Sequence, residues 1–171
     1  MLLNIDEVSK KHDRKQFDCG VEELNQFLQQ QARQKTSKHV SKTYVGCWDE
    51  SPAVVAGYYT LTGYSVSPPP VHKDYHNYPH PLSAVKLARL AVDRDCQGAR
   101  LGEKLLIDAI RRTVLAAEQI SAIGLFVDPM TPDVVPFYEQ YGFMVADPAE
   151  DDRLELWLPI GTCYDAVKDL V

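Results

Sequence analysis

Apolar residues recur at helical spacing in two segments of the chain. Between residues 19 and 35 they fall on one side of a helical projection: Val21, Leu24, Phe27, Leu28 and Ala32. This period predicts an amphipathic helix, and Asp18 before it, with Glu22 and Glu23 in its first turn, complements the positive end of a helix dipole. Residues 102–119 predict a second helix with a buried stripe of Leu105, Leu106, Ala109, Ile110, Val114 and Ala117.

Strand-forming residues alternate with turn residues in the rest of the chain. Segments rich in valine, tyrosine and threonine over 43–48 and 53–66 predict a β-hairpin, because residues 49–52 supply turn chemistry. Further elements follow: a strand over 84–92, an apolar run over 120–127, a helix over 134–141 and a last strand over 153–158. This order predicts an α/β fold with a mixed central sheet and helices on both of its faces.

Length and charge limit the class of protein. With 171 residues, of which 45% are hydrophobic, the chain predicts one globular domain over residues 1–171 that needs no disulfide or structural metal. Eighteen Lys and Arg against 24 Asp and Glu give a net charge of −6, which argues against a generally basic nucleic-acid or membrane binder. Neither a secretory signal nor a long apolar run is present, so we expect a cytoplasmic protein that does not span a membrane.

Cysteines and histidines give no metal-binding pattern. The four cysteines lie far apart without paired spacing, which favours reduced thiols. His72, His76 and His80 are spaced by four, but the surrounding prolines predict a loop over 67–81 rather than a helix. We therefore expect solvated imidazoles and no metal site.

The strand over 84–92 leads into a short polar loop with two glycines and then into the second helix. Backbone N–H groups of residues 97–103 can hold a pyrophosphate at the start of that helix. The spacing fits an ordinary strand-to-helix turn equally well. The loop is neither a P-loop nor a dinucleotide-binding fingerprint, because it lacks both glycine patterns.

A second block, Phe-Tyr-Glu-Gln-Tyr-Gly-Phe over 137–143, follows a further strand. Together the two blocks resemble the GNAT superfamily of N-acetyltransferases. The resemblance implies the GNAT acyl-CoA N-acyltransferase fold and acetyl-CoA as cosubstrate. It implies that these residues contact acetyl-CoA: Leu90, Ala91, Val92, Gln97, Gly98, Ala99, Arg100, Leu101, Gly102 and Glu103. Arg100 departs from the family pattern, since it stands where the inner glycine is usual and its side chain can crowd the phosphate or pair with one.

The N-terminal block Phe-Asp-Cys-Gly-Val-Glu-Glu-Leu-Asn-Gln-Phe-Leu over 17–28 resembles the opening of the GNAT toxins of type II toxin–antitoxin systems. This narrower resemblance implies acetylation of the α-amino group of aminoacyl-tRNA, which blocks translation. It also implies a ribbon-helix-helix antitoxin as partner and a homodimer.

Tyr138 is the candidate general acid that protonates the departing CoA thiolate. The residues alone favour a packing role beside Phe137, whereas the resemblance implies the catalytic role. No general base is marked, although Glu103 and Glu139 flank the two blocks. A base is not essential, because an α-amino group titrates near about 7.7–8.0 and an ester lowers that pKa further.

An RNA substrate requires a local basic surface on this acidic chain. Residues 29–46 carry four cations and no acid: Arg33, Lys35, Lys38 and Lys42. Together with Lys10–Lys15 and Arg89 they are candidate phosphate contacts. A solvated helix end, and for Arg89 a paired structural arginine, are the alternatives.

Two other functions fit the same sequence. The enzyme can instead acetylate a protein N-terminus, a lysine or a small amine. The chain can also be a catalytically weak GNAT-like module that binds an antitoxin and represses transcription with it, a hypothesis motivated by Arg100.

Overall fold

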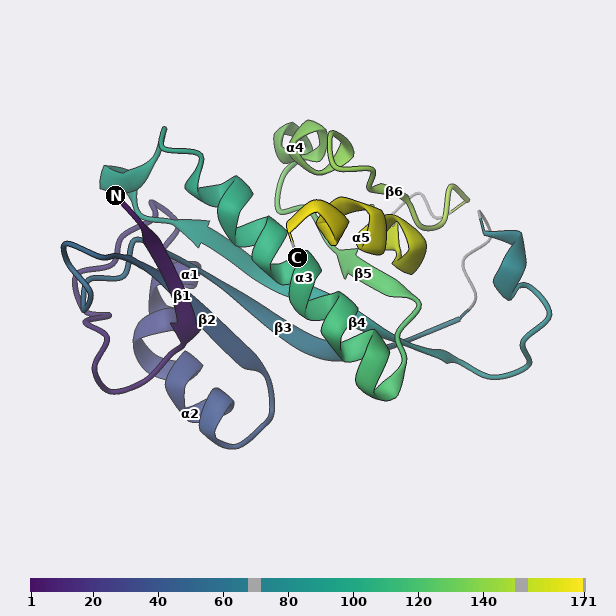
Figure 1. Cartoon of the computed structure of the whole chain (residues 1–171), viewed down its shortest axis with the longest axis horizontal. Helices are drawn as coiled ribbons and strands as arrows, with labels where there is room; N and C mark the ends of the chain where they lie inside the picture. The colour runs from purple at the N-terminus through teal and green to yellow at the C-terminus, as the bar shows by residue number, and fades with distance from the viewer. Residues whose placement is uncertain (68–71, 150–153, 171) are drawn as a thin grey trace. The chain divides into compact units, whose positions relative to one another are not determined.

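The computed structural model describes residues 1–67, 72–149 and 154–170. The chain divides into two compact units: unit 1 is residues 1–62 with 88–109, and unit 2 is residues 63–87 with 110–171. Among the described residues, seven strands form a mixed sheet in the order β1-β2-β3-β4-β5-β7-β6 (Figure 1). This topology agrees with the predicted mixed sheet.

The strands of unit 1 are antiparallel. Strand β2 (Lys42–Trp48) pairs with β3 (Gly57–Val66), with Tyr44 opposite Tyr59, which confirms the predicted hairpin. Strand β1 (Leu3–Glu7) adds to the other side of β2 and was not predicted. Its apolar side chains are only partly buried at the edge of the sheet, so its hydrophobic pattern does not distinguish it from a loop.

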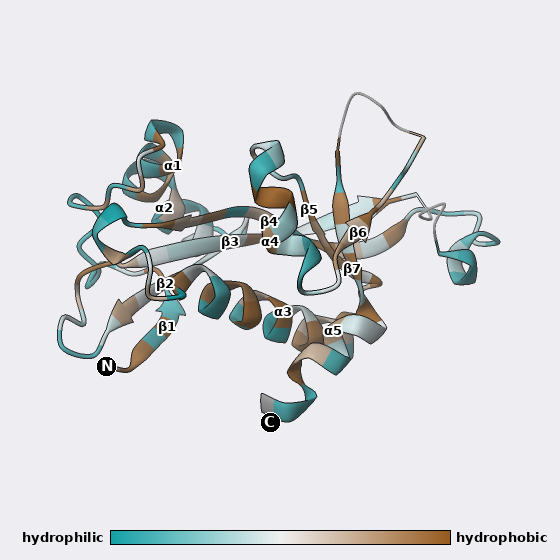
Figure 2. Cartoon of the chain, turned by 90° about the horizontal axis from the view of Figure 1, so that it is seen from above, coloured by the Kyte–Doolittle hydropathy of each residue, from teal (hydrophilic) through white to brown (hydrophobic). Residues whose placement is uncertain are grey.

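The helix predicted over 19–35 is three consecutive segments. They are α1 (Glu22–Gln26), a π-helical turn (Phe27–Gln31) and α2 (Ala32–Ser37). The predicted apolar stripe is buried except for Val21, which is the N-cap and 39% exposed. Asp18 does not cap this helix, because the structure uses its carboxylate elsewhere. In unit 1, α1 and α2 lie on one face of the strands and α3 on the other (Figure 2).

Helix α3 (Leu101–Ile120) confirms the predicted second helix. Its stripe is buried from Leu105 to Val114, and Ala117 is half-buried. In unit 1 the strand must approach α3 closely: a Cβ on Gly57 would lie 2.8 Å from Leu105 Cδ1. Glycine at this position therefore sets how tightly α3 packs on β3.

Unit 2 is built on the parallel pair of β4 (Leu82–Val92) and β5 (Gly124–Val127). The remaining strands and helices follow: β6 (Met144–Val145), β7 (Leu156–Pro159), α4 (Val135–Glu139) and α5 (Ile160–Val167). Strand β7 is antiparallel to both β5 and β6. In Figure 2, α4 and α5 lie on opposite sides of β5. Neither β6 nor α5 was predicted, and Arg153, the expected start of the last strand, lies outside the described residues.

The proline-rich segment 67–81 is a connection between β3 and β4, as predicted, although residues 68–71 lie outside the described part. It contains a 3-10 turn at Lys73–Tyr75, and the rings of His72 and Tyr75 lie 5.6 and 6.4 Å from that of Trp157. His72 is therefore partly buried rather than solvated, whereas His76 and His80 are exposed. The described residues hold no cluster of potential metal ligands, and none of their helices is long and apolar enough to cross a membrane.

Lys86 forms the ionic centre of unit 2. Its Nζ lies 2.6 Å from Glu155 Oε2, 2.9 Å from Asp128 Oδ2 and 4.5 Å from the centroid of the Tyr64 ring. The Tyr64 hydroxyl donates to the same Glu155 oxygen at 2.7 Å. One cation on β4 thus joins Tyr64 of β3 to the residue that follows β5 and the residue that precedes β7, near the aromatic pair of Phe126 and Trp157.

Lys86→Met should lower the free energy of unfolding by about 3–5 kcal/mol, because the largely buried carboxylate of Glu155 would then lose its cation. Denaturant unfolding monitored by circular dichroism measures the loss. Lys42→Met is the matched control, since its pair with Glu7 is more exposed and should contribute no more than about 1 kcal/mol. Equal losses in both variants would contradict the central role of Lys86.

Candidate functional site

The loop between β4 and α3 in unit 1 has the backbone of an anion site. Gly98 and Arg100 both have positive φ, 92° and 58°, so the chain turns sharply twice before the helix. The first helical hydrogen bond joins Lys104 N–H to Arg100 O at 3.2 Å, so the N–H groups of residues 101–103 have no acceptor within the helix. A pocket of about 330 Å³ opens at this point. It is lined by Val92, Gln97, Gly98, Arg100, Leu101 and Gly102.

The start of this loop is anchored to the N-terminal segment. Asp18 N–H donates to Asp93 Oδ2 at 3.0 Å, and Arg94 N–H donates to the Asp18 carbonyl at 2.9 Å. The Arg94 guanidinium completes the anchor through an ion pair with Asp18 Oδ2 at 2.7 Å. These three interactions therefore fix residues 93 and 94 just ahead of the loop that leads into α3.

Asn25 holds the other end of the anchor. Its Oδ1 accepts from Cys19 N–H and its Nδ2 donates to Asp18 Oδ1, both at 2.9 Å. The N–H of Gly20, which has φ of 89°, donates to the same Asp18 oxygen. Hydrogen bonds from Gly20 and Asn25, and then the charge of Arg94, hold the pKa of Asp18 below its ordinary value. This network shows that the N-terminal sequence block anchors the loop after β4, a role that sequence reasoning missed. The sequence signal for it was the Asp18-x-Gly20 turn, which is followed by Asn25.

The side chain of Arg100 does not fill the pocket of about 330 Å³ at this loop. The side chain is 80% exposed, and its Nε lies 2.7 Å from Glu103 Oε2. Glu103 is thus an ion-pair partner at the first turn of α3, and Glu139 is exposed on α4. An arginine side chain at a position where glycine is usual could crowd a bound phosphate. The Arg100 side chain does not do so, because it extends into solvent.

Leu90, Ala91 and Val92, which the resemblance assigned to acetyl-CoA contact, lie at the end of β4. The parallel pairing of β4 with β5 covers Val85–Leu87, and Leu90–Val92 lie farther along the strand. Ala91 is buried, and its carbonyl lies 3.0 Å from where a Cβ of Gly57 would be. Leu90 and Val92 are half-buried beside it.

Tyr138 lies in unit 2, on α4. Its ring is buried, with centroids 5.1 Å from Phe137 and 5.4 Å from Phe143. Burial raises the pKa of Tyr138 to about 12, above the ordinary value of 10.0 for a tyrosine phenol. The phenol consequently stays protonated at physiological pH and is available as a donor.

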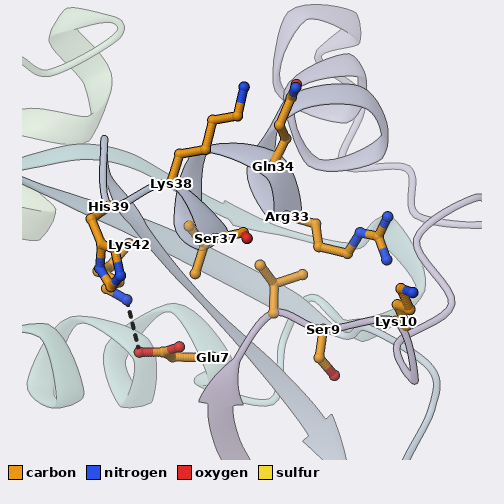
Figure 3. A pocket seen from close by; sticks show the side chains of 11 residues that line it. Glu7, Ser9, Lys10, Arg33, Gln34, Ser37, Lys38, His39 and Lys42 are labelled. Carbon is orange, nitrogen blue, oxygen red and sulfur yellow. Dashed lines mark ion pairs between the residues drawn. The ribbon is translucent and has the colours of Figure 1, made fainter.

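The structure divides the predicted basic surface into two parts. Arg33, Lys38 and Lys42 line one pocket of about 550 Å³, which we call the basic pocket. Its further charged or titratable lining residues are Glu7, Lys10 and His39. Figure 3 shows Arg33 and Lys10 on its right, and the Lys42–Glu7 ion pair of 3.4 Å on its left.

Two predicted cations lie elsewhere, on the ring of Phe27. The Arg89 guanidinium carbon is 3.6 Å from the ring centroid and Lys35 Nζ is 5.5 Å from it. Phe27 also stacks on Tyr58, whose hydroxyl donates to the Leu24 carbonyl. Arg89 and Lys35 therefore join the packing around the π-helical turn.

The family model that matches this chain and a curated relative of the chain both belong to the acetyltransferases. Residues 16–155 match the family described as Acetyltransferase (GNAT) domain. The chain is 33% identical over 144 residues to the tRNA-acetylating toxin of Mycobacterium tuberculosis, with 81% of this chain and 82% of that protein covered.

Two solved structures are similar over nearly the whole chain. AtaT complexed with acetyl-methionyl-tRNAfMet has a TM-score of 0.84 and 26% identity, with 98% of each chain covered. A tyrosine-to-phenylalanine mutant of the AtaT toxin, bound to the C-terminus of the antitoxin AtaR and to acetyl-CoA, has a TM-score of 0.78 and 26% identity. In that case 95% of this chain and 96% of that chain are covered.

Asp18→Asn should destabilise the protein at neutral pH and much less in acid. Because the folded-state pKa of Asp18 is lowered, its contribution is complete above the ordinary value of 3.8 and is lost as the pH falls further. Unfolding curves of wild type and variant at pH 7 and pH 3 test this. Asp165→Asn, at an exposed position of α5, is the control. A stability difference that does not shrink in acid would show that the Asp18 charge does not matter.

Proposed function

Because this chain belongs to the GNAT acetyltransferase family, we propose that it transfers the acetyl group of acetyl-CoA to the α-amino group of an aminoacyl-tRNA and acts as a toxin. The observation that carries the proposal is the likeness to a tRNA-acetylating toxin and to AtaT over both units of the chain. We treat residues 1–171 as one catalytic domain, since the family match runs through both units.

The loop of unit 1 is proposed to bind acetyl-CoA. Backbone N–H groups of residues 97–103 would hold the pyrophosphate, because Gly98 leaves the chain open to close approach and α3 adds its positive end. Backbone groups of Leu90–Val92 would meet the thioester and its oxyanion. No metal takes part in this scheme.

Tyr138 is proposed to serve as the general acid. Attack of the amine on the thioester carbonyl forms a tetrahedral oxyanion, whose collapse breaks the C–S bond and releases the CoA thiolate. The protonated phenol donates to that sulphur as its charge develops, and the attacking nitrogen gives up its extra proton, directly or through water, to the phenolate, so that the amide, the free thiol and the phenol result. The acceptor amine needs no strong base, because part of it is already neutral near pH 7.

The basic pocket is proposed to contact the phosphate backbone of the tRNA. Its cations, Arg33, Lys38, Lys42 and Lys10, outnumber its one acid, Glu7, although the chain as a whole has a net charge of −6. Clustering of this kind lets an acidic protein bind a polyanion locally. Lys35 and Arg89 are assigned instead to the packing of Phe27.

The proposed partners follow from the same reading. An antitoxin would neutralise the enzyme, as the AtaR complex of AtaT suggests, and we propose one of the ribbon-helix-helix type. We further propose a homodimer that works in the cytoplasm, where charged tRNA is found.

Transfer of labelled acetyl from acetyl-CoA to bulk charged tRNA tests the proposal. Label on charged but not on uncharged tRNA is the expected result. Label that appears only on protein or small amines would show that one of these, and not aminoacyl-tRNA, is the acceptor. Acetyl-CoA binding without transfer to any amine would favour a weak module that acts through its antitoxin.

Tyr138→Phe should lower kcat for acetyl transfer by roughly 10²–10⁴-fold while KM for acetyl-CoA changes little, because only the proton donor is lost. Steady-state kinetics across pH 6 to 10 measure this. The wild-type rate should rise as the amine loses its proton and then level off, since the pKa of Tyr138 near about 12 lies above that range. A variant with wild-type kcat would exclude Tyr138 as the acid.

Replacing Arg33 and Lys38 by Ala should weaken tRNA binding and reduce the slope of log K against log salt by roughly two, one for each lost phosphate contact. Filter binding over a range of salt concentrations gives the slope. Lys35→Ala is the control, because its ammonium lies on Phe27. An unchanged slope in the double variant would show that the basic pocket does not contact tRNA phosphates.

A further inference from the structure

We propose that Arg100 binds the 3′-phosphate of CoA and thereby makes the enzyme select acetyl-CoA over 3′-dephospho-acetyl-CoA. The inference rests on the proposed function, because it takes the loop before α3 as the pyrophosphate site. It concerns a residue at which this chain departs from the family pattern, where a glycine is usual.

Backbone position is the first reason. Arg100 has φ of 58°, a left-handed conformation that is strained for a residue with a side chain and unstrained for glycine. Glycine would adopt it without strain, so the loop geometry alone gives no reason for an arginine here. The side chain must therefore contribute something that the backbone does not.

The guanidinium is also placed to receive a second anion. Arg100 lines the pocket of the loop, yet its side chain is 80% exposed. The ion pair with Glu103 uses Nε, and a guanidinium carries four further N–H donors on its terminal nitrogens. An exposed pair of this kind contributes little to stability, so a ligand can reorganise it easily.

CoA chemistry identifies the anion. The molecule carries a pyrophosphate and one terminal phosphate on the ribose, and the backbone cradle accounts for the pyrophosphate. A terminal phosphate has a charge of about −1.5 to −2 and three acceptor oxygens, which suits a bidentate guanidinium. It also competes effectively with the single carboxylate of Glu103.

Equilibrium binding of acetyl-CoA and of 3′-dephospho-acetyl-CoA tests the proposal without any tRNA. The wild-type protein should bind acetyl-CoA roughly tenfold more tightly, as expected for one charge-assisted interaction. Arg100→Gly should bring the two affinities together by weakening acetyl-CoA alone. Arg100→Lys should retain part of the preference, because an ammonium keeps the charge but not the fork.

Two further variants sharpen the result. Lys104→Gln removes a cation of the same helical turn, but that ammonium lies 5.3 Å from the Trp48 ring centroid, so the preference should persist. Glu103→Gln frees the guanidinium and should keep or increase the preference. Equal weakening of both ligands in Arg100→Gly would assign Arg100 to the pyrophosphate and overturn the proposal, as would no change at all. A wild-type protein that binds neither ligand would overturn the proposed function as well.

Discussion

The carboxylate of Asp93 joins the parts of unit 1 on which the candidate site depends. Its Oδ2 accepts from Asp18 N–H at 3.0 Å and its Oδ1 from Asp95 N–H at 2.9 Å, while its own N–H donates to Ala56 O at 2.9 Å. One residue thus holds the N-terminal segment, the approach to β3 and the loop after β4 in fixed register. A backbone anion site works only if its N–H groups are already oriented, so this anchor precedes any ligand binding.

The groups proposed for cofactor binding and for proton donation lie in different units and in different surroundings. In unit 1 the loop between β4 and α3 is open, and its proposed pyrophosphate site depends on backbone conformation. In unit 2 Tyr138 is packed among Phe137 and Phe143, and burial keeps its phenol protonated. The same unit holds the ion pairs of Lys86 with Asp128 and Glu155, of which Lys86 and Glu155 are largely buried. The proposed reaction needs both, a prepared anion cradle and a shielded proton donor.

The sequence predicted the elements that bury a full face. Helix α3 was found because its apolar residues repeat at helical spacing. The β2–β3 hairpin was found from its valine, tyrosine and threonine content around turn residues, and β5 from a short apolar run. Strand β1 escaped because it is a half-exposed edge, and β6 because two exposed residues leave no period. The amphipathic pattern before residue 35 was correct, yet it gave no hint of the π-helical turn at Phe27. Arg33 and Lys35 look equivalent in sequence, but the helix directs one to the basic pocket and the other to an aromatic ring.

Amide hydrogen exchange followed by NMR, with and without acetyl-CoA, tests most directly whether the loop before α3 is the cofactor site. The account predicts that acetyl-CoA slows exchange of the amides of residues 97–103, with Arg94 already protected in the free protein by its bond to Asp18. Acetyl-CoA binding that leaves the exchange of these loop amides unchanged would contradict it.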